Sequence, residues 1–112
     1  MDATQALIEA RDLIKDPARW TQGAYARDAD GRAVSSTSPE ACQWCAMGVV
    51  AKVAGRHDFL TAMRLSEEML TRLDRAAGES PLVLGSITKL NDHQGHEAVL
   101  KMFAKAINEG AV

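Results

Sequence analysis

Four residues of the chain have the types and the spacing of a zinc site. Cys42-x-x-Cys45 supplies two thiols and His93-x-x-His96 supplies two imidazoles. Two cysteines and two histidines are a common tetrahedral ligand set for structural zinc. Such a C-x-x-C pair usually comes from a tight turn, whereas these cysteines lie in the apolar stretch "ACQWCAMGVVAKVAG". We therefore expect no metal and no other cofactor, and Cys42, Cys45, His93 and His96 remain the alternative metal set.

The same part of the sequence also offers the parts of a thiol hydrolase or transferase. Cys45 would be the nucleophile, His96 its general base, and Asp92 (or Asn91) the group that orients the imidazole. A histidine on an apolar helix face is more often a hydrogen-bonded structural residue than a catalyst. No oxyanion hole is recognisable in the sequence. The sequence thus favours a non-enzymatic protein, with the Cys-His enzyme as the alternative.

A third use of the two cysteines is to fill the core. Ser38-Pro39 has the form of a helix cap followed by a first helical residue, so we expect a helix over residues 41–53. Nearly the whole circumference of such a helix is apolar, and free cysteine is among the most buried residue types. A redox role would need Cys42 in the first helical turn, where the helix dipole lowers a thiol pKa, and here it would lie deeper. We expect Cys42 and Cys45 to be buried in this central helix.

The elements that position these residues are predicted to be mostly helices. Residues 3–15 have apolar side chains at i, i+3, i+4 and i+7 spacing, with Asp2 and Gln5 at capping-box spacing. Asp30-Gly31 is a turn signal between two short arms and predicts a short hairpin or an extended excursion. In the central helix, Gly48 would allow a neighbouring helix to approach closely.

An amphipathic helix is predicted between Asp58, its cap, and Gly78, which ends it. Its inward face is expected to consist of Phe59, Met63, Met69, Leu70, Leu73 and Ala77. Its charged residues Glu67, Glu68, Arg72 and Arg75 have helical spacing and predict a solvated face with weak ion pairs.

Two further helices complete the prediction. The first begins at Ser80-Pro81 and continues to about Leu90. The second spans residues 96–108 and is capped by Gly110. Its inward residues are expected to be Val99, Leu100, Phe103 and Ile107.

Length and charge restrict the function. With 112 residues, the chain is expected to form a single domain, 1–112. The formal net charge is -2 and the 13 basic residues are scattered, so we expect no nucleic-acid partner. No apolar run approaches the roughly 20 residues needed to span a bilayer. The acidic N-terminus is unlike a signal peptide, and two cysteines make no disulfide framework, so we expect no membrane partner and a cytoplasmic location.

Three segments resemble a known family in their order along the chain. They are "ARWTQGAYARDADGR", "WCAMG" and "LNDHQGHEAVL". Together they resemble a family of small bacterial and phage-associated proteins classed as a domain of unknown function. The resemblance covers most of the chain and implies a mostly helical fold without an assigned activity. The residues that match the motifs are Trp20, Gly23, Gly31, Trp44, Cys45, Ala46, Gly48, Asn91, Asp92, His96 and Glu97.

Taken together, these features predict an all-α fold of about five helices with a short hairpin or extended excursion after the first. The predicted function is that of a non-enzymatic accessory, interaction or ligand-binding protein. Its partner would be a protein or a small molecule, with a homodimer as an option. The ligand would bind between the excursion after Trp20 and the segment 91–96. The predicted contact residues are Trp20, Tyr25, Trp44, Asn91, Asp92 and His96.

Overall fold

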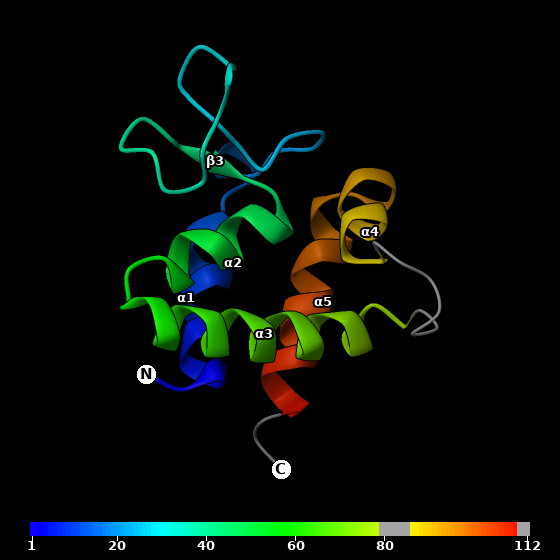
Figure 1. The fold of residues 1–112 in the computed structure, drawn as a ribbon. Coiled ribbons are helices and arrows are strands. Elements are labelled where there is room, and N and C mark those ends of the chain that lie inside the picture. The colour runs from blue at the N-terminus through cyan, green and yellow to red at the C-terminus, as the bar shows by residue number, and fades with distance from the viewer. Residues whose placement is uncertain (79–85, 110–112) are drawn as a thin grey trace.

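The computed structural model describes residues 1–78 and 86–109 (Figure 1). The described chain contains five α-helices, a short 3-10 helix and three strands of two residues each. In chain order these are α1 (Ala3–Ile14), η1 (Pro17–Arg19), β1 (Ala26–Arg27), β2 (Ala33–Val34), β3 (Gln43–Trp44), α2 (Ala46–Ala54), α3 (Phe59–Ala76), α4 (Ser86–Gln94) and α5 (His96–Glu109). Figure 1 shows α3 crossing in front of α1 and α5, with α2 above α3 and the strands at one end of the molecule. Within the described residues, no helix is both long and apolar enough to cross a membrane.

The first helix forms as its sequence pattern predicts. The side chain of Asp2 accepts a hydrogen bond from the backbone N–H of Gln5 at 2.8 Å, which satisfies one of the free donors at the helix start. The apolar stripe faces the core, and its buried members are Ala3, Ala6, Leu7, Ala10 and Ile14. Periodicity and capping indicate the same start, and α1 begins at the predicted residue. It ends one residue before the predicted end.

The predicted hairpin exists, but it is part of a three-stranded antiparallel sheet. β1 pairs with β2. Between them, the carboxylate of Asp28 accepts hydrogen bonds from the backbone N–H groups of Asp30 and Arg32. The Asp28 carbonyl accepts from the N–H of Gly31, which takes the positive φ of 82° that the turn requires. The strand that the sequence analysis missed is β3, which pairs with the other edge of β1 to give the order β2-β1-β3. The fold is therefore mostly helical rather than all-α.

The central helix begins later than predicted. Ser38-Pro39 forms a turn, in which the backbone N–H of Ala41 bonds to the carbonyl of Ser38, and β3 follows. The helix starts only at Ala46, with Cys45 as its cap. The predicted start fails because pairing of β3 with β1 holds the backbone of residues 43–44 extended, and this tertiary contact overrides a local cap signal.

Gly48 allows another segment to approach α2 closely, but that segment is the backbone before β1 and not a neighbouring helix. A Cβ at this position would lie 1.8 Å from the carbonyl oxygen of Tyr25. The first turn of α2 therefore packs directly on the backbone that leads into β1. A second link holds the same two segments together, because the backbone N–H of Cys45 donates to the Tyr25 carbonyl at 3.1 Å.

The third helix differs from the prediction on both of its faces. Phe59 and Met63, expected inside, are 75% and 54% exposed. Arg72, expected in solvent, is buried, and its guanidinium donates to the carbonyls of Ala106 and Ile107 near the end of α5. Leu65 takes the inward place, together with Met69 and Leu73. The apolar stripe of α3 is therefore rotated relative to the predicted one.

The last two helices meet at Gly95, which has a φ of 91°. α4 continues through Asn91 to Gln94 instead of ending near Leu90, while the predicted start at Ser80-Pro81 lies outside the described residues. α5 begins at the predicted residue, and the predicted cap Gly110 is again outside the described part. Its buried residues are Val99, Met102, Phe103 and Ala106, so Leu100 and Ile107 lie at the edge of the core.

Candidate functional site

A hydrogen-bonded cluster centred on Asn91 joins three parts of the fold. Its side-chain oxygen accepts from the indole Nε1 of Trp20 at 2.8 Å and from the backbone N–H of Ala46 at 3.0 Å. Its side-chain nitrogen donates to the Thr21 carbonyl and to the Asp92 carboxylate. Asn91 is 1% exposed, so both acceptor positions and both donors are used inside the protein. We call Trp20, Thr21, Ala46, Asn91 and Asp92 the Asn91 cluster.

His96 serves the end of α1. Its Nε2 lies 2.7 Å from the carbonyl oxygen of Ile14, the last residue of that helix. A carbonyl only accepts, so Nε2 carries the proton and donates it. The imidazole also packs against Trp20, with ring centroids 5.3 Å apart and planes tilted by 55°. His96 thus satisfies one of the carbonyls that a helix leaves free at its C-terminus.

Cys45 lies at the N-terminus of α2, where its sulfur accepts a hydrogen bond from the backbone N–H of Gly48 at 3.3 Å. It is 7% exposed, as the core interpretation predicts. Burial raises the pKa of its thiol, and the negative charge of Asp92 acts in the same direction. The N–H groups of Gly48 and Met47 lower it without offsetting the burial. At neutral pH the group is a protonated thiol.

Cys42 is in a different environment from Cys45 and does not belong to the core. It is exposed, and its backbone N–H donates to the carbonyl of Arg27 beside the sheet. The prediction of two buried cysteines is wrong for Cys42, because the residue precedes β3 instead of lying within a helix. Its alternative partner in the metal set, His93, is also exposed. Across residues 1–78 and 86–109 there is no group of three or more His, Cys, Asp or Glu side chains placed to hold a metal ion.

Trp44 packs inside the protein. It is 4% exposed, and its indole Nε1 donates to the carbonyl of Ser36 at 3.0 Å. The ammonium of Lys52 lies 5.8 Å from the centre of its ring. Its backbone forms an isolated parallel β-bridge with Trp20, which ties the segment after η1 to β3.

A hollow of 510 Å³ lies between the strand region and α4. Residues 23–25 and 33–35 line one side of it, and Cys45, Thr88 and Asp92 line the other. This is close to the predicted ligand position, between the excursion and the segment 91–96. Of the predicted contact residues, Tyr25 and Asp92 line this space, whereas the two tryptophans, Asn91 and His96 are absent from its wall. We call it the Asp92 hollow.

Among the described residues that line the Asp92 hollow, Asp92 is the one with a charged side chain. One carboxylate oxygen, Oδ1, accepts from the backbone N–H of Gly23 at 3.2 Å and from the Asn91 amide at 3.0 Å. Gln22 reinforces this arrangement, because its amide donates to the backbone carbonyls of both Asn91 and Asp92. The carboxylate is held in one orientation by groups from two distant parts of the chain.

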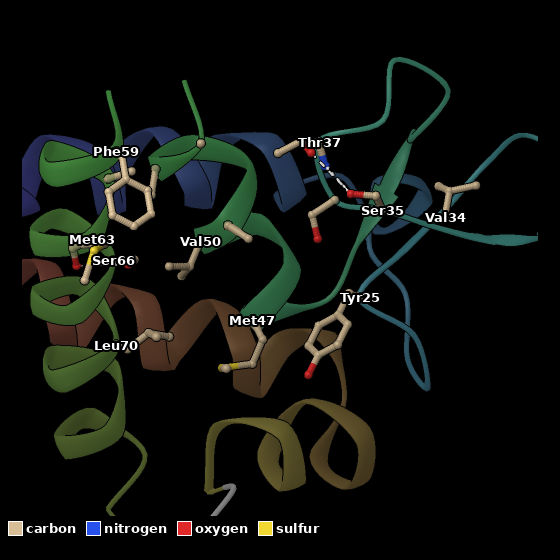
Figure 2. Close-up of a pocket in the computed structure, with 15 residues that line it drawn as sticks. Tyr25, Val34, Ser35, Thr37, Met47, Val50, Phe59, Met63, Ser66 and Leu70 are labelled. Carbon is tan, nitrogen blue, oxygen red and sulfur yellow. Dashed lines mark hydrogen bonds between the residues drawn. The ribbon is translucent and has the colours of Figure 1, made fainter. Parts of the chain in front are cut away.

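A second hollow, of 590 Å³, was not predicted. It lies between the strand region, α2 and α3, and we call it the α2–α3 groove (Figure 2). Tyr25 borders it on one side, and Phe59 and Met63 border it on the other, with Met47 and Val50 between them. The sequence signal was present as large apolar residues at helical spacing, but it was assigned to the core.

Comparison with known proteins gives one match. No curated protein and no solved structure matches the chain. The family model described as "Family of unknown function (DUF6197)" matches residues 1–109, and the chain therefore belongs to this family.

Proposed function

We propose that this is a non-enzymatic ligand-binding protein, and that the Asp92 hollow takes a small molecule with an ammonium or guanidinium group beside an apolar part. The observation that carries the proposal is the Asp92 carboxylate, which is half-buried, fixed in orientation, and the single charge among the described residues that line the cavity.

The fixed carboxylate favours a cation. Only Oδ1 has a hydrogen-bond partner among the described residues, so Oδ2 can accept from a ligand. Charge-assisted hydrogen bonds are roughly twice as strong as neutral ones, and a partly buried site weakens the competition from water. Because Gly23 and Asn91 already hold the carboxylate, little side-chain freedom is lost when a ligand binds.

The rest of the wall suits an apolar part with a few polar anchors. Ala24, Ala33 and Val34 supply apolar surface, and the hydroxyls of Ser35 and Thr88 can hydrogen-bond. The ring of Tyr25 is 64% exposed and can cover a cation through its π face. The volume lies in the range of about 300–1,000 Å³ that small-molecule sites occupy.

The Cys-His hydrolase or transferase is less well supported. Cys45 lines the Asp92 hollow, which is the observation in its favour. A thiol nucleophile reacts as the thiolate, yet burial and Asp92 both raise this pKa. The expected base, His96, directs Nε2 to the Ile14 carbonyl and packs on Trp20, away from the wall of the hollow.

The test uses a matched set of small probes: phenethylammonium, butylguanidinium, neutral phenethyl alcohol and anionic phenylpropionate. Binding is followed by chemical-shift changes of the backbone amides, and we expect the two cations to shift Gly23 and Thr88. Asp92→Asn keeps the shape of the side chain and its acceptor oxygen but removes the charge, so cation affinity should fall by about tenfold or more.

Asp30→Asn is the control, because it makes the same change of charge in the exposed turn between β1 and β2. It should leave affinity unchanged. The proposal fails if neutral and anionic probes shift these amides as strongly as the cations do, or if Asp92→Asn binds cations like the wild type.

A further inference from the structure

The Asp92 hollow and the α2–α3 groove lie next to each other. Tyr25, Val34 and Ser35 line both spaces. Of these three residues, Tyr25 and Ser35 are exposed and Val34 is half-buried, so the boundary between the two spaces lies at the protein surface. Figure 2 shows Tyr25 at the edge of the groove, on the side of the strand region. A molecule that lies in one space can therefore extend across this boundary into the other.

The two spaces differ in charge. The Asp92 hollow has one carboxylate, whose Oδ2 can accept from a ligand. The described residues that line the groove include no charged side chain, and its wall contains Met47, Val50 and Leu70. A charged group would lose water in this groove without gaining a partner, whereas an apolar chain is stabilised by burial. The two spaces together match a molecule with a cation at one end and an apolar chain at the other.

The hydroxyl groups along the groove already have partners. The hydroxyls of Ser35 and Thr37 hydrogen-bond to each other at 3.2 Å (Figure 2). The hydroxyl of Ser66 donates to the backbone carbonyl of Met63 at 3.2 Å. A ligand in the groove therefore has no hydrogen bond that it must supply, which favours a hydrocarbon chain over a polar group.

The edge of the groove is apolar where a solvent-facing helix is normally polar. Phe59, Leu60 and Met63 are exposed at the start of α3, and we call them the outer face of α3. Phe59 and Met63 line the groove, whereas Leu60 does not. Apolar surface that is left in water beside a cavity marks a binding site. A chain in the groove would cover Phe59 and Met63 and leave Leu60 in solvent.

We propose that the ligand is a long-chain alkylammonium, with its head at Asp92 and its chain passing Tyr25 into the α2–α3 groove. This inference rests on the proposed function of the Asp92 hollow and specifies the apolar part of its ligand. A flexible chain can follow two adjoining spaces, whereas a rigid ring system has to fit within one of them. A single molecule that fills both spaces loses its translational and rotational freedom only once.

The test is a series of linear amines from butylammonium to dodecylammonium, each kept below its critical micelle concentration. Titration calorimetry gives the affinity, and the backbone amide shifts of Gly23 and Val50 report on the head and the chain. We expect the affinity to rise by about twofold to fourfold for each added methylene, because each buried CH₂ stabilises the complex. Butylammonium should shift Gly23 alone, and the longer amines should shift Val50 as well.

Two variants separate the head from the chain. Asp92→Asn should lower the affinity for every amine by about tenfold or more and keep the dependence on chain length. Met63→Gln places a polar side chain on the groove wall and should lower the ratio of dodecylammonium to butylammonium affinity by about fivefold. Leu60→Gln is the matched control, because it makes a similar change on the same helix outside the groove. It should keep the ratio, and circular dichroism checks that every variant is folded.

The outcomes distinguish this inference from the proposed function. If butylammonium binds at Gly23 but the affinity does not rise with chain length, the inference is wrong and the proposed function stands. If no amine binds at Gly23, the proposed function fails and the inference fails with it. Neutral 1-octanol that binds the groove as tightly as octylammonium would overturn the inference, because the chain would not need Asp92. Equal effects of Leu60→Gln and Met63→Gln would also overturn it, by placing the chain outside the groove.

Discussion

The Asn91 cluster and the outer face of α3 use their residues in opposite ways. In the cluster, polar side chains that are suited to chemistry are buried and bond to one another. On α3, large apolar side chains that are suited to a core are exposed. No buried side-chain nitrogen or oxygen in the described residues lacks a partner, so within the cluster the half-buried Asp92 carboxylate alone, through Oδ2, has an acceptor left for a ligand. The comparison shows that residue type alone does not tell which side chains of this protein are free to contact another molecule, because hydrogen-bond satisfaction and exposure decide it.

The largest effect should come from breaking the cluster. Asn91→Ala leaves the Trp20 indole N–H, the Ala46 N–H and the Thr21 carbonyl without their bonds. Each buried polar group that loses its partner costs about 1–3 kcal/mol, so we expect a loss of about 3–5 kcal/mol in the free energy of unfolding. Urea denaturation measures it.

Asn108→Ala, which removes an exposed amide near the end of α5, is the control and should change stability by less than about 0.5 kcal/mol. If Asn91→Ala were as stable as this control, the cluster would not be the polar link that joins the three segments.

The second prediction compares two leucines on the same helix. Leu65 is 2% exposed and Leu60 is 74% exposed. Leu65→Ala should lower the free energy of unfolding by about 2–5 kcal/mol because it opens a cavity. Leu60→Ala should change it by less than about 0.5 kcal/mol, because the side chain is already in solvent. Equal losses at the two positions would mean that α3 is rotated from the orientation described.

The third prediction concerns the pH dependence of stability and has the smallest effect. The folded-state pKa of Cys45 is raised, so the unfolded chain releases this proton first as pH rises. The contribution of Cys45 is therefore complete below the ordinary thiol pKa of about 8.5. Above it, this contribution declines by at most about 1.4 kcal/mol per pH unit, until the folded-state pKa is reached.

Thermal or urea unfolding at several alkaline pH values would detect this slope. Cys45→Ser keeps an acceptor for the Gly48 N–H, so the cap should remain while the cysteine-dependent part of the slope disappears. Cys42→Ser, at an exposed thiol, should keep the wild-type slope. A slope that survives in Cys45→Ser would come from another group and would contradict the assignment.

Local patterns predicted the fold where neighbouring residues alone decide the structure. The cap at Asp2, the turn at Asp30-Gly31 and the start of α5 all depend on residues a few positions apart. The start of α2 depends instead on β3 pairing with β1, across a loop that no periodicity describes. Arg72 was assigned to solvent because its carbonyl partners, at Ala106 and Ile107, come from α5.

The same limit applies to the candidate site. The sequence singled out Trp20, Asn91, Asp92 and Cys45, and the structure brings them into one region. The sequence could not show that Trp20 and Asn91, which are 71 positions apart, are hydrogen-bonded to each other and so are not free to contact a ligand through these groups. Asp92 and Tyr25 line a cavity because α4 packs against the strand region, and sequence spacing does not encode this packing.

Tyr25 connects the two hollows. Its side chain forms part of the wall of both the Asp92 hollow and the α2–α3 groove, while its backbone is held by the Cys45 N–H and the close contact with Gly48. Because the backbone of Tyr25 is held in place, its side chain can change position only by rotating about its own bonds. If a ligand in the Asp92 hollow selects one rotamer of Tyr25, the shape of the α2–α3 groove changes with it. Two ligands, one in each space, would then be thermodynamically linked, and each would change the affinity for the other by the same factor.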